Sequence, residues 1–240
     1  MNKLVSIFGL DFTGLQVDDV IKTTENTKVI TTVNAEFIVE ANESNNRLKN
    51  IISSTVSTFD GQVPYLIAKL FNPKCLFDKI SGSDLIYDFI NKAKTESLSI
   101  FFLGGLEETN FKAVNNIKNK GINAFGYSPP YSDYPFSDDW CDDIRLALFE
   151  SKPDILLVCF GAVKQEFWID DNIDFLNEIG VKFVYGAGGT VDFIAGTKYR
   201  APIFLQKIGL EGVYRLFKEP KLFRFMRILK SFRIFKYINN

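Results

Sequence analysis

The sequence predicts an α/β fold in which helices cover both faces of a parallel β-sheet. Short, almost wholly apolar runs alternate along the chain with segments that show helical periodicity. Apolar runs without polar alternation are typical of strands buried on both faces, and strands separated by helices pair in parallel through right-handed crossovers. With 240 residues, of which 46% are hydrophobic, the chain can bury the core that such a fold needs.

The first third of the chain contains two predicted strands. A helical segment at 17–23 is followed by the strand Lys28–Val33, a mainly helical segment at 35–52 and a short strand at 55–59. Asn34 stands where the first strand passes into the second helix, so its side chain is suited to cap that helix.

From residue 82 onward the alternation becomes regular. The predicted helices lie at 83–94, 107–119, 138–151 and from residue 164, and the predicted strands lie at 99–105, 122–125, 154–161 and 181–186. The segment 126–136 contains three Pro and three Tyr, which predicts an irregular loop.

The charges divide the chain into an acidic body and a basic tail. Residues 1–197 contain 17 Lys and Arg against 27 Asp and Glu, whereas residues 198–240 contain 11 against 2. No linker rich in Pro, Gly or Ser separates the two parts. We therefore predict an α/β body at 1–197 and a basic helical appendage at 198–240 that docks on it.

The missing residue types exclude several classes of site. The chain contains no His, so imidazole bases and histidine metal ligands are excluded, and a general base must be a carboxylate, Lys, Tyr or thiolate. The three Cys form no CxxC pair, which indicates reduced thiols in a cytosolic protein. No signal peptide is apparent, and no run approaches the roughly 18 apolar residues of a spanning helix, so we expect at most peripheral membrane contact.

Two turns follow predicted strands, where α/β proteins place their ligands. Gly188 and Gly189 belong to GAGGT, which could bring backbone N–H groups to an anion or could be only a tight turn. It lacks the GxGxxG pattern of a dinucleotide site. Lys164, Gln165 and Glu166 open a helix after a buried strand, where they could bind a nucleotide or sugar or form a solvated helix start.

Three polar residues of the first third allow two interpretations each. Thr32 and Asn34 at a strand end could bind a ligand or form a turn. Asp60 precedes Gly61 at the end of a strand, so it is a plausible general base, although Asp-Gly is also an ordinary turn. No DxD triplet occurs, and the sequence offers no clear candidate for a metal ligand.

The tail combines basic and apolar residues. A basic side chain recurs at every third position, at Lys221, Arg224, Arg227, Lys230, Arg233 and Lys236. Three-residue steps fall about 60° short of a helical turn, so the stripe drifts and predicts two short helices or a bent one. An anionic membrane surface suits both residue types. A core helix of the body is the first alternative; a nucleic-acid arm is the second, which the many apolar residues disfavour.

Several motifs together resemble one known family. They are TxNxE at 32–36, Asp60-Gly61, GSDL at 82–85, GAVKQEFWI at 161–169 and GAGGTVDFIAGTKYRAPIFLQKIGLEGVYRLFKEP at 186–220. In that order they are similar to the WecG/TagA/CpsF glycosyltransferases, known as glycosyltransferase family 26. The similarity covers nearly the whole chain, and the last motif is long enough to be specific.

The resemblance implies a bacterial, inverting transferase with a Rossmann-like catalytic body and a helical C-terminal appendage that faces the membrane. Such an enzyme moves a hexose, for example N-acetylmannosamine, from a UDP-sugar to a polyprenyl-diphosphate-linked acceptor sugar at the cytoplasmic face. Teichoic acid, capsule, common antigen and exopolysaccharide synthesis are all possible pathways. No metal, other cofactor or nucleic acid is expected.

Carried over by position, the resemblance makes Asp60 the general base that takes a proton from the acceptor hydroxyl. The matching polar positions of the donor site or active site are Thr32, Asn34, Gln165 and Asp192. The cations that could stabilise the leaving diphosphate are Lys79, Arg200 and Arg215.

Three positions depart from the family pattern. Lys79 stands where Arg is usual, Val163 where Pro is usual and Gly212 where Trp is usual. These departures bear on the sugar more than on the class of reaction. The alternative from another class is a non-catalytic, membrane-associated subunit that binds a nucleotide-sugar or acts as a scaffold in polysaccharide assembly.

Overall fold

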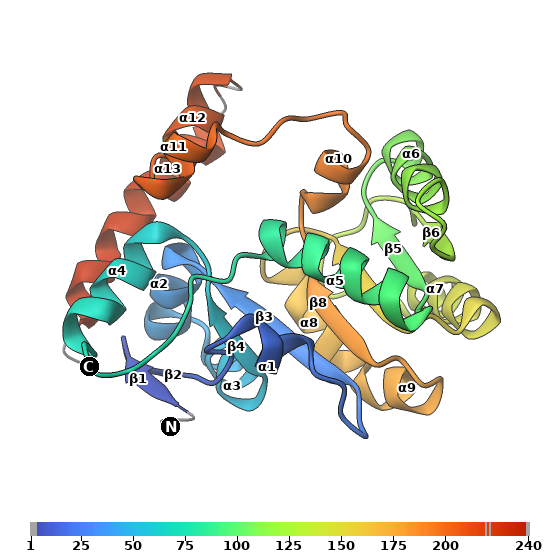
Figure 1. The fold of residues 1–240 in the computed structure, drawn as a ribbon, viewed down its shortest axis with the longest axis horizontal. Coiled ribbons are helices and arrows are strands. Elements are labelled where there is room, and N and C mark those ends of the chain that lie inside the picture. Colours follow the sequence, from blue (N-terminus) through green and yellow to red (C-terminus); the bar gives the residue numbers. More distant parts are fainter. Residues whose placement is uncertain (1–3, 219, 221, 239–240) are drawn as a thin grey trace. The chain divides into compact units, whose positions relative to one another are not determined.

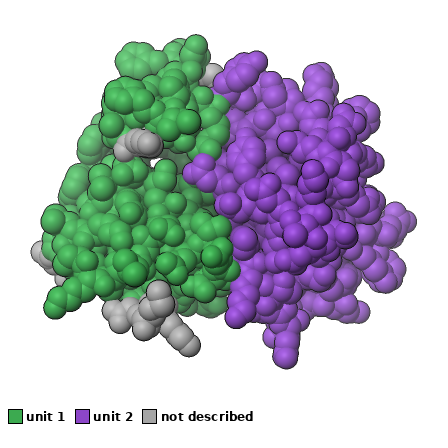
Figure 2. Space-filling model, viewed as in Figure 1, with its two compact units in different colours: residues 1–20, 31–81, 200–240 green, residues 21–30, 82–199 purple. Residues whose placement is uncertain are grey.

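The computed structural model describes residues 4–218, 220 and 222–238, without the side chains of Lys207, Arg215 and Phe223. It divides into two compact units (Figures 1 and 2). Unit 1 comprises residues 1–20, 31–81 and 200–240, and unit 2 comprises residues 21–30 and 82–199. The boundary predicted after residue 197 lies close to residue 200, where the chain enters unit 1 for the last time. The division into a body and an appendage stays a prediction.

Six strands form one sheet in the order β4-β3-β8-β7-β5-β6. Their bounds are β3 Lys28–Val33, β4 Val56–Phe59, β5 Ile100–Gly104, β6 Ala124–Tyr127, β7 Ile155–Cys159 and β8 Phe183–Gly186. The pairs β3–β8, β8–β7, β7–β5 and β5–β6 are parallel, which confirms the predicted α/β class. Every residue of β5 is buried, and this explains why its sequence has no polar alternation.

Helices cover both faces of the sheet in unit 2. Successive strand residues point to opposite faces, and on one face Phe183 and Tyr185 of β8 lie against Phe89. Phe89 belongs to α5 (Gly82–Glu96), and its ring centroid is 5.1 Å from that of Phe183. Unit 2 also contains α6 Glu107–Lys118 and α10 Thr190–Ile194.

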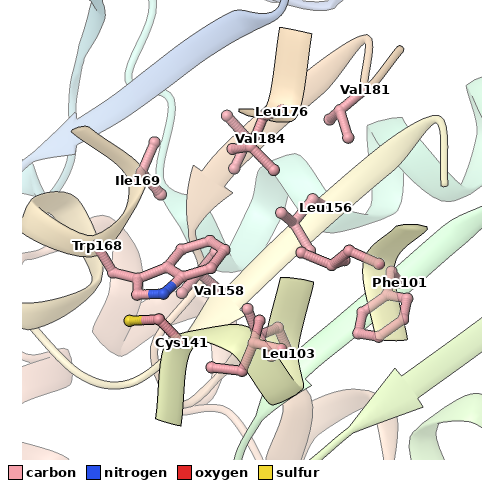
Figure 3. Close-up of a cluster of buried hydrophobic side chains, with 12 residues drawn as sticks. Phe101, Leu103, Cys141, Leu156, Val158, Trp168, Ile169, Leu176, Val181 and Val184 are labelled. Carbon is pink, nitrogen blue, oxygen red and sulfur yellow. The ribbon is translucent and has the colours of Figure 1, made fainter. Parts of the chain in front are cut away.

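The opposite face carries a buried apolar cluster (Figure 3). Its helices are α7 Asp138–Ser151, α8 Lys164–Asp171 and α9 Ile173–Glu178. Fully buried Trp168 of α8 lies beside Cys141 of α7 and close to Val158 of β7. This packing fixes the start of α8 against the carboxyl end of β7, where sequence analysis placed candidate ligand-binding residues.

Unit 1 contains more elements than the sequence predicted. The hairpin β1 Val5–Ile7 and β2 Leu10–Phe12 was not expected, nor was α4 Gln62–Phe71. The segment expected as one helix at 35–52 forms two, α2 Ala35–Glu43 and α3 Asn46–Ser54. The break occurs because the Asn45 side chain accepts a hydrogen bond from the Leu48 amide and thereby starts a new helix. The short helix α1 Val17–Ile21 follows the hairpin.

The basic repeat was predicted to form two short helices or a bent one, and its described residues form an α-helix followed by a 3₁₀ helix. The tail as a whole contains a series of short helices. They are α11 Ile203–Lys207, α12 Glu211–Lys218, α13 Leu222–Ser231 and the 3₁₀ helix η1 Phe232–Tyr237. Within unit 1, α13 and η1 pack against α2. In the part of the chain that the structure describes, no helix has the length and apolar character needed to cross a bilayer.

Candidate functional site

Three predicted site residues of unit 1 come from the ends of adjacent backbone segments. The backbone N–H of Asp60 donates to the carbonyl of Val33 at 3.0 Å, which places Asp60 beside the residue that precedes Asn34. Lys79 is paired with Phe59 through a parallel bridge. The backbone segments that carry Asn34, Asp60 and Lys79 therefore run side by side at one strand end.

The backbone that carries Asp60 is held by a rigid aromatic support. Phe59 is fully buried, and its ring stacks on Phe12 with a centroid distance of 3.9 Å. The ring of Phe77 also contacts Phe59, with a distance of 5.0 Å between the two ring centroids. Gly61 has a φ of 93°, which turns the chain directly into α4 and favours glycine. Asp60 itself is half-buried, so part of this residue stays open to a ligand.

Asn34 caps α2, as predicted. Its Oδ1 accepts hydrogen bonds from the backbone N–H groups of Glu36 and Phe37 at 3.0 and 3.1 Å. A ligand contact from this side chain would therefore use its Nδ2 group. Thr32 lies within β3 and is 9% exposed. The roles of Thr32 and Asn34 in substrate binding remain predictions.

The two predicted arginines of unit 1 lie near α11 and within α12. Arg200 donates from Nη2 to Oε1 of Gln206 at 2.9 Å, and Gln206 in turn donates to the carbonyl of Ala201. The amide of Gln206 thereby orients one end of the guanidinium. Arg215 belongs to α12, and its side chain lies outside the described residues. Phosphate binding by either residue stays a prediction.

Unit 2 joins Gln165, Glu166 and Gly188 in one chain of hydrogen bonds. The Gly188 amide donates to Oε1 of Gln165 at 3.1 Å, and Nε2 of Gln165 donates to Oε1 of Glu166 at 2.9 Å. The other carboxylate oxygen of Glu166 accepts from the Val163 amide at 2.7 Å. Gln165 and Glu166 are each only 5% exposed. This chain links the loop after β7 to the loop after β8.

Burial changes the acidity of Glu166. It raises the pKa of this carboxyl to about 7, although hydrogen bonds from Gln165 and from the Val163 amide act in the opposite direction. Because it is almost wholly buried, Glu166 is poorly placed to touch a substrate itself. It is better placed to act on the residues that surround it.

The GAGGT turn uses many of its own backbone donors. Gly188 has a φ of 51°, which confirms that this glycine supplies a left-handed conformation. The amides of Ala187, Thr190 and Asp192 donate to the carbonyls of Val158, Ala187 and Gly189 in turn. An anion bound here would therefore depend more on side-chain cations than on these three amides. Anion binding by Gly188 and Gly189 stays a prediction.

Lys164 and Asp192 are already engaged in ion pairs. The Lys164 ammonium pairs with Asp133 and lies 4.8 Å from the ring centroid of Tyr131, which fastens the irregular loop to the start of α8. The hydrogen bond to Lys164 lowers the pKa of the Asp133 carboxyl. Lys198 lies 2.8 Å from Oδ2 of Asp192. A ligand that used either predicted residue would have to compete with these partners.

A charge ladder joins the tail to α2 within unit 1. The ion pairs of this ladder are Arg227–Glu36, Lys230–Glu40 and Arg233–Glu43. The three acids lie on one face of α2 because their spacing of four and three residues matches the helical repeat. Arg233 belongs to η1, and the hydroxyl of Tyr237, at the end of the same helix, also donates to Glu43 at 2.9 Å. The basic repeat is apparent in the sequence, but its acidic partners are not, because they lie about 190 positions away in the chain.

Replacing Glu40 with Lys is expected to loosen the tail. The change places two ammonium groups opposite each other at Lys230, in the middle of the ladder, and should lower the free energy of unfolding by about 1 kcal/mol. Amide hydrogen exchange in α13 should become faster, and the double variant Glu40→Lys, Lys230→Glu should restore it. A matched control is Glu108→Lys, opposite Lys112 on α6 of unit 2. Unchanged exchange in the single variant would show that the ladder does not hold the tail.

The chain matches known proteins along nearly its whole length. The model of the glycosyl transferase WecG/TagA/CpsF family matches residues 5–238. An N-acetylglucosaminyldiphosphoundecaprenol N-acetyl-beta-D-mannosaminyltransferase of Staphylococcus aureus (strain MRSA252) is 31% identical over 243 residues, which cover 97% of this chain and 91% of the relative. The protein of the same name from Bacillus spizizenii is 30% identical over 200 residues, covering 82% and 74%. The chain thus belongs to the WecG/TagA/CpsF family of glycosyl transferases.

Proposed function

We propose that this glycosyltransferase moves an N-acetylmannosamine-like hexose from a UDP-sugar to an acceptor sugar carried on a polyprenyl diphosphate, with inversion at the anomeric carbon. The names of the relatives describe transfer of N-acetyl-beta-D-mannosamine to N-acetylglucosaminyldiphosphoundecaprenol, and the similarity extends over nearly the full length of the first of them. The structural observation that supports the proposal is that the backbone segments of Asn34, Asp60 and Lys79 meet at the ends of β3 and β4, through the Asp60–Val33 hydrogen bond and the Phe59–Lys79 bridge.

Asp60 is assigned the role of general base. Its carboxylate accepts the proton of the acceptor hydroxyl while that oxygen forms a bond to the anomeric carbon of the donor. The bond between this carbon and the diphosphate oxygen breaks, and its electron pair leaves with UDP. Because the acceptor oxygen enters on the face opposite the leaving group, the configuration inverts. The rigid aromatic support of Phe59 suits this role, because a base must be held in place to act.

Side-chain cations are assigned the role of stabilising the negative charge that develops on the leaving diphosphate. Lys79 lies at the same strand end as Asp60, and Arg200 is oriented by Gln206. Charge-assisted hydrogen bonds from such groups to phosphate oxygens favour departure of UDP. Among the described residues, no three His, Cys, Asp or Glu side chains gather in a group that could hold a metal ion. We propose transfer without a metal ion, which the comparison of rates with and without EDTA tests.

The donor is tested with a panel of UDP-sugars and a synthetic acceptor, N-acetylglucosamine linked through diphosphate to a short polyprenol. Formation of UDP and of a disaccharide-lipid with one or a few donors, at the same rate in EDTA, is the expected result. Binding of a UDP-sugar without turnover on any lipid-linked acceptor would instead favour a non-catalytic binding subunit.

The tail is assigned to peripheral attachment at an anionic membrane surface, at the cytoplasmic face. Among the described side chains of α13 and η1, the exposed apolar ones are Leu222, Phe225, Met226, Leu229, Phe232 and Phe235. Three of the tail's basic residues are paired within the ladder, so their attraction to lipid headgroups is partly offset. Burial of apolar side chains should therefore contribute more to membrane affinity than the basic repeat alone suggested.

The double variant Phe232→Ser, Phe235→Ser is expected to bind vesicles of phosphatidylglycerol and phosphatidylcholine at least about tenfold more weakly than the wild type. Each exposed Phe that enters the interface contributes an apolar burial of about 1.5–3 kcal/mol at most. Sedimentation with vesicles at low and high salt measures the effect. The control is Phe111→Ser, because Phe111 is 66% exposed on α6 of unit 2. Equal binding by the double variant and the wild type would remove the tail from the membrane contact.

A further inference from the structure

The residue that precedes α8 has an unusual backbone conformation. Val163 has a φ of 70° and a ψ of −45°. This region is strained for any residue with a Cβ, and for a β-branched side chain it is a rare exception. Such a conformation persists only where the surroundings hold it. Two hydrogen bonds hold it here: the Val163 amide donates to the carboxylate of Glu166 at 2.7 Å, and the Val163 carbonyl accepts from the Phe167 amide at 3.0 Å.

The same carboxylate determines how the side-chain amide of Gln165 is oriented. An ionised carboxylate can only accept hydrogen bonds, so Gln165 must turn its Nε2 group toward Glu166. Its Oε1 atom then faces the Gly188 amide, which donates to it at 3.1 Å and also to the Val158 carbonyl at 3.3 Å. If the residue at 166 could also donate, the opposite orientation of Gln165 would become available, and it would place two N–H donors against each other at Gly188.

The adjacent strand leaves room for this pair of side chains. A Cβ atom on Gly186, the last residue of β8, would lie 2.2 Å from Nε2 of Gln165 and 2.3 Å from Oε1 of Glu166. Only glycine permits both side chains to pack against β8 in this way. The loops after β7 and β8 are thereby coupled through one buried polar contact, and not through their backbones alone.

We propose that Glu166 is a positioning residue, which holds Val163 in its strained conformation and orients Gln165 so that the loops after β7 and β8 stay in the geometry needed to bind the sugar-nucleotide donor. The inference rests on the proposed function for the identity of the ligand, a nucleoside diphosphate sugar. The sequence suggested that Glu166 could bind a nucleotide or sugar directly. In this proposal Glu166 acts through Gln165 and Val163 and does not touch the donor.

The test is Glu166→Gln, which keeps the size of the side chain but replaces one acceptor oxygen with a donor. Assays at a pH of about 8 keep the wild-type carboxyl ionised. The expected result is a KM for the UDP-sugar raised by about tenfold or more with kcat changed less than threefold or so, because one hydrogen bond to a charged group is lost. The exposed carboxylate of Glu178 on α9 provides the matched control, Glu178→Gln.

Relief of the backbone strain supplies a second measurement. Glycine adopts positive φ readily, so Val163→Gly should remove the need for the carboxylate to hold residue 163. The double variant Glu166→Gln, Val163→Gly should therefore recover much of the affinity lost in the single Gln variant. If Glu166 had a purely structural role, the losses of UDP-sugar affinity caused by the two substitutions would add.

Amide hydrogen exchange separates this inference from the proposed function. In Glu166→Gln the amide of residue 163 should exchange at least about tenfold faster than in the wild type and in Glu178→Gln, even if no UDP-sugar proves to be the donor. The Gly188 amide keeps its hydrogen bond to the Val158 carbonyl, so its exchange should become faster by a smaller factor. Faster exchange without donor binding by the wild-type protein would contradict the proposed function alone. Unchanged exchange at both amides, or an unchanged KM in an active enzyme, would overturn the positioning role of Glu166.

Discussion

Replacing Asp60 with Asn is expected to lower kcat by about 10²–10⁴-fold, because a positioned general base contributes an acceleration of this size. The substitution keeps the shape of the side chain, and the backbone hydrogen bond from residue 60 to Val33 does not depend on it. The KM for the UDP-sugar and the midpoint of thermal unfolding should therefore stay close to those of the wild type. Initial rates of UDP release with saturating donor and acceptor measure the effect.

A matched control for this substitution is Asp174→Asn on the exposed surface of α9. It removes one carboxylate from unit 2 and should leave the rate unchanged. If Asp60→Asn retains activity within about tenfold of the wild type, Asp60 is not the base, since that loss is smaller than general bases contribute. The proton would then have to pass to another carboxylate, a Lys or a Tyr.

Replacing Gly186 with Ala is expected to have the largest effect on stability. The added Cβ would overlap Nε2 of Gln165 and Oε1 of Glu166, both of which are buried and hydrogen-bonded. Neither side chain can move aside without breaking the chain of hydrogen bonds to Gly188, so the free energy of unfolding should fall by about 1–3 kcal/mol or more. Urea unfolding followed by circular dichroism measures it, and donor affinity should fall with it.

The adjacent turn offers a control for the steric argument. A Cβ on Gly189 would have Asp192 at 3.6 Å as its nearest neighbour, an ordinary van der Waals contact, and Gly189 has a φ of −76°. Gly189→Ala should therefore leave the free energy of unfolding within about 0.5 kcal/mol of the wild type. If Gly186→Ala is as stable as Gly189→Ala, the buried polar contact is not close-packed in solution.

Much of the fold could be predicted because its signals are local. The helix Asp138–Ser151 has the predicted bounds, since the Ser137 side chain accepts from the Trp140 amide and marks its start. The β1–β2 hairpin was missed because its turn is Phe8-Gly9, with φ of 60° and 66°, and Phe is not among the residues that normally signal such a turn. The prediction of a single helix at 35–52 was wrong because the cap formed by Asn45 is not apparent from apolar periodicity.

The candidate site was less predictable, because its contacts connect distant parts of the sequence. The motifs identified Asp60, Lys79 and Gln165, but the sequence does not show that Lys79 is bridged to Phe59 or that Gln165 reaches Gly188. The strain at Val163 could not be predicted either, since only the backbone angles reveal it. The charge ladder was missed because the tail's basic repeat was read without its acidic partners on α2.

The charge ladder also changes how the tail is understood. The sequence suggested a membrane contact made by basic and apolar side chains together, and in the structure Arg227, Lys230 and Arg233 form ion pairs with Glu36, Glu40 and Glu43. An anionic bilayer would compete with these acids for the same side chains. Screening by salt weakens exposed pairs of both kinds, so apolar burial is the contribution that should persist at high ionic strength.

The stereochemistry of the product tests the central claim most directly. The wild-type enzyme is incubated with an α-linked UDP-N-acetylmannosamine and the lipid-linked N-acetylglucosamine acceptor, and the anomeric configuration of the new bond is determined by nuclear magnetic resonance. Single displacement by an acceptor hydroxyl deprotonated by Asp60 predicts a β-linked disaccharide and one UDP per bond formed. An α-linked product, which requires retention, or release of UDP without any glycosidic bond, would contradict the account.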